Sequence, residues 1–138
     1  MYRQKTPFWL TMIHTLFCDG NSKKISWTIE SDGNRVEQFR EHAEIYKDIV
    51  TDNQSKYIAL HVGIFWGIGV FIIKNGDTVK IQLDSDEMIQ HLSTDEISLD
   101  RLAEDKKRFI KMLAEQRNLK YLYCKIPHEN NISSKLLQ

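Results

Sequence analysis

Apolar and polar residues alternate strictly along KKISWTIE, at residues 23–30. A period of two is typical of a half-buried β-strand, because successive side chains point to opposite faces of the sheet. One face of this strand is apolar and carries Ile25, Trp27 and Ile29. The other face is polar and carries Lys24, Ser26 and Thr28. The pattern therefore predicts a strand with one buried face.

Turn residues and further periodic stretches divide the rest of the chain. Asp32–Gly33 between apolar runs is a strong hairpin signal. The return strand falls within 35–50, where the pattern is poor and a helical interpretation of part of the segment stays open. The expected elements, in chain order, are strands at 10–18, 23–30 and within 35–50, a helix from about 53, a strand at 78–84, helices at 85–93 and 98–117, a strand at 119–126 and a short closing helix.

Two of the expected helices carry more detailed predictions. The first has Asp52 or Asn53 as its N-cap, since both side chains accept hydrogen bonds from free backbone N–H groups. The helix at 98–117 has an apolar stripe at helical spacing. The stripe consists of Leu99, Leu102, Phe109, Met112 and Leu113.

The apolar stretch YIALHVGIFWGIGVFII, at 57–73, raises the question of a membrane helix. Its length is at the lower limit for spanning a bilayer, and Gly63 and Gly67 have the spacing that lets membrane helices approach one another. Three glycines and the β-branched group at 70–73 favour instead a buried helix that gives way to other structure. We therefore expect a central helix and no membrane partner.

Composition and charge narrow the classes of function. A chain of 138 residues suits one domain, 1–138. Nineteen basic residues balance nineteen acidic ones, so there is no global basic field for tight non-specific binding to nucleic acid. Six acids without a base lie in 84–100, and eight bases with three acids in 101–125. Such a split is typical of solvated helix faces, or of a surface for a charged partner.

The cysteine content and the N-terminus bear on the compartment. Cys18 and Cys124 are too few for a disulfide framework and are expected to be buried thiols in a reducing compartment, which is the cytoplasm. The first eighteen residues fail as a secretion signal, because Pro7 and His14 interrupt the apolar run and Phe17 is bulky where cleavage requires small residues.

Four short motifs, in order, resemble the ribonuclease H family over nearly the whole chain. They are Asp19–Gly20 at the end of the first strand, TDNQSKYIALHVGI at 51–64, Asp84–Ser85 after the fourth strand, and PHENNISSKLL at 127–137. The resemblance implies a five-stranded mixed α/β sheet, whose first three strands form an antiparallel meander, with helices on both faces. It also implies metal-dependent hydrolysis of the RNA strand in RNA–DNA hybrids.

In that family four carboxylates hold two magnesium ions, which activate a water and stabilise the leaving oxygen. Two of the four positions are retained here, as Asp19 and Asp84. The glutamate position of the central helix is Lys56, and the last aspartate position is Lys135. We hypothesise that the two ammonium groups lie among the two aspartates, where relatives hold Mg²⁺ or Mn²⁺, so that no metal cofactor is required. Lysine is a flexible point charge suited to such a place.

Two alternatives to this hypothesis stay open. Lys56 can extend to solvent from the first helical turn, and Lys135 can be free near the end of the chain. A shifted alignment would instead recruit Asp52 or Glu44 as the missing carboxylate.

Other polar residues are candidates for binding. Asn21 and Asn53 occupy positions that would contact a nucleic-acid backbone, and Lys106, Lys107 and Arg108 could contact phosphates, as could Lys111. His128 precedes Glu129 where the family often carries an arginine or a mobile histidine, although an exposed loop histidine is the simpler interpretation. His61 is expected to be a hydrogen-bonded core residue.

The sequence thus predicts a ribonuclease H-like domain with a degenerate metal site, a non-catalytic module that binds nucleic acid or a protein. RNA–DNA hybrid and double-stranded RNA are the expected nucleic-acid partners. The alternative is an active or weak Mg²⁺-dependent endoribonuclease that cleaves RNA in RNA–DNA hybrids.

Overall fold

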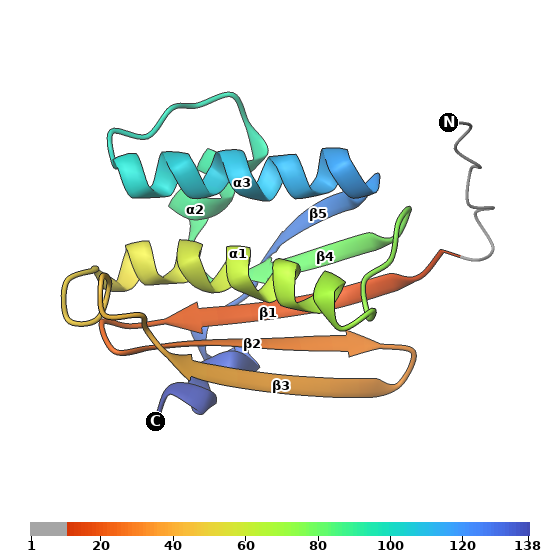
Figure 1. The fold of residues 1–138 in the computed structure, drawn as a ribbon, viewed down its shortest axis with the longest axis horizontal. Helices are drawn as coiled ribbons and strands as arrows, with labels where there is room; N and C mark the ends of the chain where they lie inside the picture. Colours follow the sequence, from red (N-terminus) through yellow and green to blue (C-terminus); the bar gives the residue numbers. More distant parts are fainter. Residues whose placement is uncertain (1–10) are drawn as a thin grey trace.

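The computed structural model describes residues 11–138, shown in Figure 1. Part of the stretch considered above as a secretion signal lies outside the described residues. Leu10 of the first expected strand also lies outside them. The elements are β1 (Ile13–Gly20), β2 (Lys24–Ser31), β3 (Asn34–Glu41), α1 (Asp52–Gly69), β4 (Thr78–Leu83), α2 (Asp86–Ser93), α3 (Arg101–Arg117), β5 (Lys120–Lys125), and the 3₁₀ helices η2 (His128–Asn130) and η3 (Ile132–Leu137).

The strands form one five-stranded sheet in the order β3-β2-β1-β4-β5. The first three strands form an antiparallel meander, whereas β4 runs parallel to both β1 and β5. The mixed α/β sheet expected from the sequence is therefore confirmed. Cys18 on β1 and Cys124 on β5 have β4 between them and are free thiols, but only Cys18 is buried.

The helices cover the two faces of the sheet unequally. The α-helices lie together on one face, where α1 contacts β1, β2 and α3 (Figure 1), and Tyr57 of α1 bonds His91 of α2. The opposite face is covered in part by η3, which contacts β1, β2 and β3. The expected helices on both faces are therefore present, as α-helices on one face and the 3₁₀ helix η3 on the other.

Strand β2 is buried on both faces. Trp27 packs toward α1, where Gly63 leaves space for its side chain. On the other face Ser26 and Thr28 are completely buried, because they hydrogen-bond Ser133 of η3. The sequence pattern predicted that this polar face of β2 would be exposed. In the structure it is covered by a segment more than one hundred residues away in the chain.

Helix α1 begins one residue earlier than the sequence indicated. Its N-cap is Thr51, whose hydroxyl accepts from the Gln54 N–H while the Gln54 side chain accepts from the Thr51 N–H. The expectation of Asp52 or Asn53 at this position is wrong, because this reciprocal capping box satisfies two backbone donors at once. The helix ends at Gly69, as the break near 70–73 predicted. In the described part of the chain, no helix is both long and apolar enough to cross a membrane.

Helix α3 corrects the predicted apolar stripe. It begins at Arg101, after the N-cap Asp100, so Leu99 precedes the helix and is fully exposed. Its buried positions are Ala103 and Ile110. Leu102 and Leu113 of the predicted stripe are partly buried against the core, whereas Phe109 and Met112 are 37% and 38% exposed. The predicted stripe is therefore confirmed at Leu102 and Leu113 and wrong at Leu99.

The third strand, whose limits the sequence left open, is Asn34–Glu41, and residues 44–50 form turns rather than a helix. The poor pattern has a physical cause, since β3 is an edge strand on which most side chains are exposed.

Candidate functional site

The parallel pairing of β1 with β4 brings two distant aspartates to one edge of the sheet. Phe17 lies opposite Gln82, so Asp19 near the end of β1 and Asp84 just after β4 come out side by side. Both side chains are almost completely buried. Because the carboxyl ends of parallel strands meet at a common edge, this geometry follows from the topology alone.

Helix α1 reaches this edge because β1 ends in a glycine. A Cβ on Gly20 would lie 2.1 Å from the Ser55 Oγ, so only glycine allows the first turn of α1 to pack against the strand. That contact places Lys56, the next residue of α1, over the two aspartates. Its Nζ lies 3.0 Å from the Asp84 Oδ1, and its side chain is only 22% exposed.

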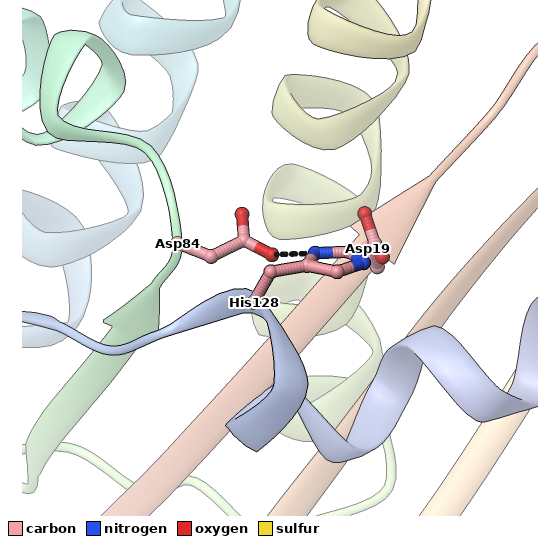
Figure 2. Close-up of side chains that lie close together, drawn as sticks. All are labelled: Asp19, Asp84 and His128. Carbon is pink, nitrogen blue, oxygen red and sulfur yellow. Dashed lines mark hydrogen bonds and ion pairs between the residues drawn. The ribbon is translucent and has the colours of Figure 1, made fainter.

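The second carboxylate oxygen of Asp84 is also engaged. His128 Nδ1 lies 2.8 Å from the Asp84 Oδ2. Figure 2 marks this contact with a dashed line. Asn131 Nδ2 donates to the same oxygen at 3.2 Å and to the carbonyl oxygen of Cys18 at 3.0 Å. Asp84 is therefore shared by α1, η2 and the segment that enters η3.

The charges of this group perturb three pKa values. Burial would raise the pKa of Asp84, but hydrogen bonds from His128, Lys56 and Asn131 outweigh it and lower the pKa. Burial opposes the charged form of Lys56 as well, yet the adjacent Asp84 raises its pKa. Burial, and then the negative charges of Asp19 and Asp84, raise the pKa of the Cys18 thiol, which keeps that thiol protonated. The aspartate and the lysine thus stabilise each other's charged forms.

Asp19 is satisfied by a residue that the sequence did not single out. Its Oδ1 accepts from the Gly20 N–H at 2.8 Å, and its Oδ2 accepts from the Ser134 hydroxyl. Lys135, the next residue, is exposed and has no ion pair with either aspartate within the described residues. Only one of the two ammonium groups hypothesised at the site lies there. The sequence feature that could have indicated Ser134 as a site residue is its position next to Lys135 in the last motif.

These residues do not fit the pair of magnesium ions that the family resemblance implies. One ligand atom each from Asp19, Asp84 and His128 lies within 4.8 Å of the others, which resembles a partial cation site. However, the Lys56 ammonium bonds directly to one of those carboxylates. An ion within about 4 Å of that ammonium would be repelled by several kcal/mol at moderate dielectric. Mg²⁺ also requires near-octahedral oxygen ligands, which two aspartates alone supply poorly.

The chain is similar to solved proteins in fold, although the sequence identity is low. No family model and no curated protein matches the chain. The RNase H1 of the archaeon Halobacterium salinarum NRC-1 superposes with a TM-score of 0.70 at 16% identity, over 91% of this chain and 93% of that one. The chain has the ribonuclease H-like fold.

Two further structures with this fold are similar. The N-terminal RNase H domain of rv2228c from Mycobacterium tuberculosis gives a TM-score of 0.69 at 14% identity, with 91% of each chain covered. LC11-RNase H1, isolated from compost and solved in complex with an RNA/DNA hybrid, gives 0.68 at 17% identity, covering 91% of this chain and 93% of that one.

In this RNase H-like chain, neither Asp52 nor Glu44 belongs to the Asp19–Asp84–His128 group, and both are exposed.

The asparagines proposed for binding have different environments. Asn21 uses its Oδ1 to accept from the N–H groups of Lys23 and Lys24, so this side chain shapes the turn between β1 and β2. Asn53 is exposed in the first turn of α1, one residue from Gln54. Of the two, Asn53 has the side chain directed to solvent.

The basic segment of α3 is largely engaged within the protein. Lys106 Nζ lies 3.2 Å from the His61 Nδ1. Lys107 donates to the carbonyl oxygens of residues 94 and 96, and Arg108 pairs with Asp105. Lys111, by contrast, is exposed. Contacts of this segment with phosphates remain a prediction. They would require Lys107 to break its hydrogen bonds to the carbonyl oxygens of residues 94 and 96.

His61 is half-buried between α1 and α3 rather than in the core. Its ring stacks on Phe109 with 5.5 Å between centroids. Burial, and then the neighbouring Lys106 ammonium, lower the pKa of His61 to about 4. The imidazole is therefore neutral near pH 7 and can accept from Lys106 through Nδ1.

Replacing Lys56 with methionine keeps most of its length and removes its charge. We expect a loss of about 2 kcal/mol in the free energy of unfolding at pH 7, less than for a fully buried pair because Lys56 is partly exposed. The Asp84 pKa is lowered, so the pair's contribution is present above the unfolded pKa of about 4 and is lost as pH falls through the folded value. The Lys56 pKa is raised, so the contribution is present below about pH 10 and is lost as pH rises further.

The measurement is urea unfolding of wild type and Lys56→Met between pH 3 and 11, followed by tryptophan fluorescence. The difference between the two proteins should be greatest in the window between about pH 4 and 10. A double-mutant cycle with Asp84→Asn isolates the pair. A difference that does not change with pH would contradict the ion pair.

Proposed function

We propose that this RNase H-like chain binds a nucleic-acid duplex and does not cleave it. The observation that carries the proposal is the contact between the Lys56 ammonium and Asp84, where the family resemblance calls for a glutamate and a metal-bound aspartate. Without that metal pair, hydrolysis has no activated water and no stabilised leaving oxygen.

The fold supports the binding half of the proposal. The similar LC11-RNase H1 has been solved in complex with an RNA/DNA hybrid. Recognition of such a duplex relies on its shape, 2′-hydroxyls and phosphates, and does not itself require the metal pair. The neutralised cluster also carries less negative charge than four carboxylates, so it repels a phosphate backbone less. An RNA–DNA hybrid is therefore the ligand that we propose.

Fluorescence anisotropy with a labelled RNA–DNA hybrid tests this function. We expect binding of similar strength in EDTA and in Mn²⁺, with no cleavage products in either, and no rise in Tm on titration with Mg²⁺ or Mn²⁺. Asn53→Ala should weaken binding about threefold to tenfold, since one lost polar contact is worth on the order of 1 kcal/mol.

A matched control is Asn75→Ala, an exposed loop residue that precedes β4 and so lies at the opposite end of the sheet. This variant should bind as wild type does. The proposal is contradicted if the protein does not bind the hybrid. It is also contradicted if the protein binds all duplexes equally well and Asn53→Ala leaves that binding unchanged.

A second candidate function is magnesium-dependent cleavage of RNA in hybrids. It is favoured by one observation, the approach of Asp19, Asp84 and His128 within 4.8 Å. Cleavage of a hybrid that is abolished by Asp84→Asn would establish this activity and overturn the non-catalytic proposal.

A further inference from the structure

Three side chains far apart in the sequence form a buried chain of hydrogen bonds at the other end of β1. Ser31, the last residue of β2, has its Oγ 2.5 Å from the His14 Nδ1. The His14 Nε2 lies 2.8 Å from the Asp77 Oδ2, in the loop before β4. A hydroxyl, an imidazole and a carboxylate thus follow one another within hydrogen-bond distance, which is the arrangement of an activated serine.

Asp77 is held in place by the backbone. Its Oδ1 accepts from the Met12 N–H at 3.0 Å, and its Oδ2 accepts from the Lys74 N–H at 2.8 Å. An ionised carboxylate only accepts hydrogen bonds, so the proton of a neutral His14 is on Nε2. Nδ1 is then the acceptor that faces Ser31. Asp77 therefore fixes the imidazole in the tautomer that a general base requires.

The serine is accessible, although its partners are not. His14 is completely buried and Asp77 nearly so, whereas Ser31 is half-buried and lines an open cavity of about 540 Å³. The apolar part of the cavity wall includes Val36, Phe71 and Ile72. A small molecule with an apolar group could therefore reach the hydroxyl.

Three charged side chains line the same cavity, Asp32, Arg35 and Lys74, and Arg35 is paired with Glu30. Lys74, within residues 11–138, has no carboxylate at ion-pair distance from its side chain. A cation beside a reacting carbonyl stabilises the oxyanion that forms on it. The cavity is separate from the Asp19 cluster, because His14 and Asp19 are five residues apart along β1, roughly 16 Å.

We propose that Ser31, His14 and Asp77 form a nucleophilic site that hydrolyses small carboxylic esters with an apolar acyl group. Ser31 Oγ forms a bond to the carbonyl carbon while its proton passes to the His14 Nδ1. The carbon–oxygen bond to the alcohol then breaks, and the alcohol leaves with that proton. Water attacks the acyl-serine, gives its proton to His14, and releases the carboxylic acid as the proton returns to Ser31.

The chain contains a second serine–histidine contact that lacks these features. Ser55 Oγ lies 2.7 Å from the His42 Nε2, but both residues are buried, and the same nitrogen lies 3.0 Å from the Asn21 carbonyl oxygen rather than a carboxylate. Ser55 is therefore an internal reference for a serine that is hydrogen-bonded to histidine but neither accessible nor coupled to a carboxylate.

A fluorophosphonate probe and p-nitrophenyl butyrate test the proposal. The probe should label wild-type protein once, at Ser31 and not at Ser55, as located by peptide mass spectrometry. Ser31→Ala should abolish labelling and lower ester turnover at least about a hundredfold, and Asp77→Asn should lower both strongly. Ser93→Ala, an exposed serine bonded to its own helix, should leave both unchanged.

Unfolding of each variant is followed by circular dichroism. If Asp77→Asn does not fold, Ser31→Ala decides alone, since it removes only a half-buried hydroxyl. The proposal is overturned if the probe does not label Ser31, or if labelling or ester turnover persists in Ser31→Ala. It is also overturned if unlabelled wild-type protein does not turn over the ester. None of these outcomes depends on hybrid binding, so the nucleic-acid proposal is tested separately.

Discussion

Lys56→Glu is expected to make the stability of the protein depend on a divalent cation. Without metal, the change removes the partner of Asp84 and adds a third carboxylate beside two buried ones. We expect a loss of about 4 kcal/mol in the free energy of unfolding, as for a broken buried ion pair. With Mn²⁺ at a hundred times its Kd, binding to the native state should return about 2.7 kcal/mol.

The measurement is the Tm of wild type and variant in EDTA and in increasing Mn²⁺. Lys56→Gln is the matched control, because it also breaks the ion pair but adds no carboxylate. It should be destabilised without any response to Mn²⁺. A wild-type Tm that rises with Mn²⁺ as much as that of Lys56→Glu would show that the ammonium does not exclude the ion.

Gly20→Ala is expected to destabilise the fold by about 3 kcal/mol, near the upper end of overpacking effects. The new Cβ would lie 2.1 Å from the Ser55 Oγ and 2.9 Å from the Ser55 carbonyl carbon. The side chain of Ser55 is fully buried and bonded to His42, and the carbonyl carbon belongs to the first turn of α1, so neither atom can move cheaply. The first turn of α1 would have to shift, and Lys56 with it.

Urea unfolding measures the loss, and Gly69→Ala serves as control. Nothing lies within 4 Å of a Cβ at Gly69, the last residue of α1, so that variant should be neutral or slightly more stable. If Gly20→Ala were as stable as wild type, the close approach of α1 to β1 would not be what positions Lys56.

Periodicity predicted the strands that carry one apolar face, and it was least informative in the edge strand, where few side chains are buried. The edge strand β3 is exposed on most side chains, so no alternation marks its limits. The burial of Ser26 and Thr28 was not predictable, because it depends on η3 packing from more than one hundred residues away. Likewise, Leu99 fits a helical stripe by spacing, yet the Asp100 cap starts the helix after it.

The candidate site was predictable as far as motifs place residues on strands and helices. Asp19, Lys56 and Asp84 come together as the parallel pairing of β1 and β4 requires. The positions of Ser134 and Lys135 depend instead on the rotation of a short 3₁₀ turn, for which one residue decides whether a side chain faces the sheet or solvent.

The Ser31–His14–Asp77 chain had no sequence signal at all. His14 is 17 residues from Ser31 and 63 from Asp77, with no recognisable spacing between them. Each of the three residues is unremarkable in its local pattern, and two of them lie at turns where serine and aspartate are common. Only the strand order brings them together.

The docking of η3 has a consequence for how the chain matures during translation. Ser133 contacts β1 and β2 at sequence separations of 105 to 116, so the sheet face around Ser26 and Thr28 stays uncovered until that segment has left the ribosome. A nascent chain would therefore expose two hydrated hydroxyl groups on this face rather than apolar side chains. This polar surface disfavours association with other incomplete chains.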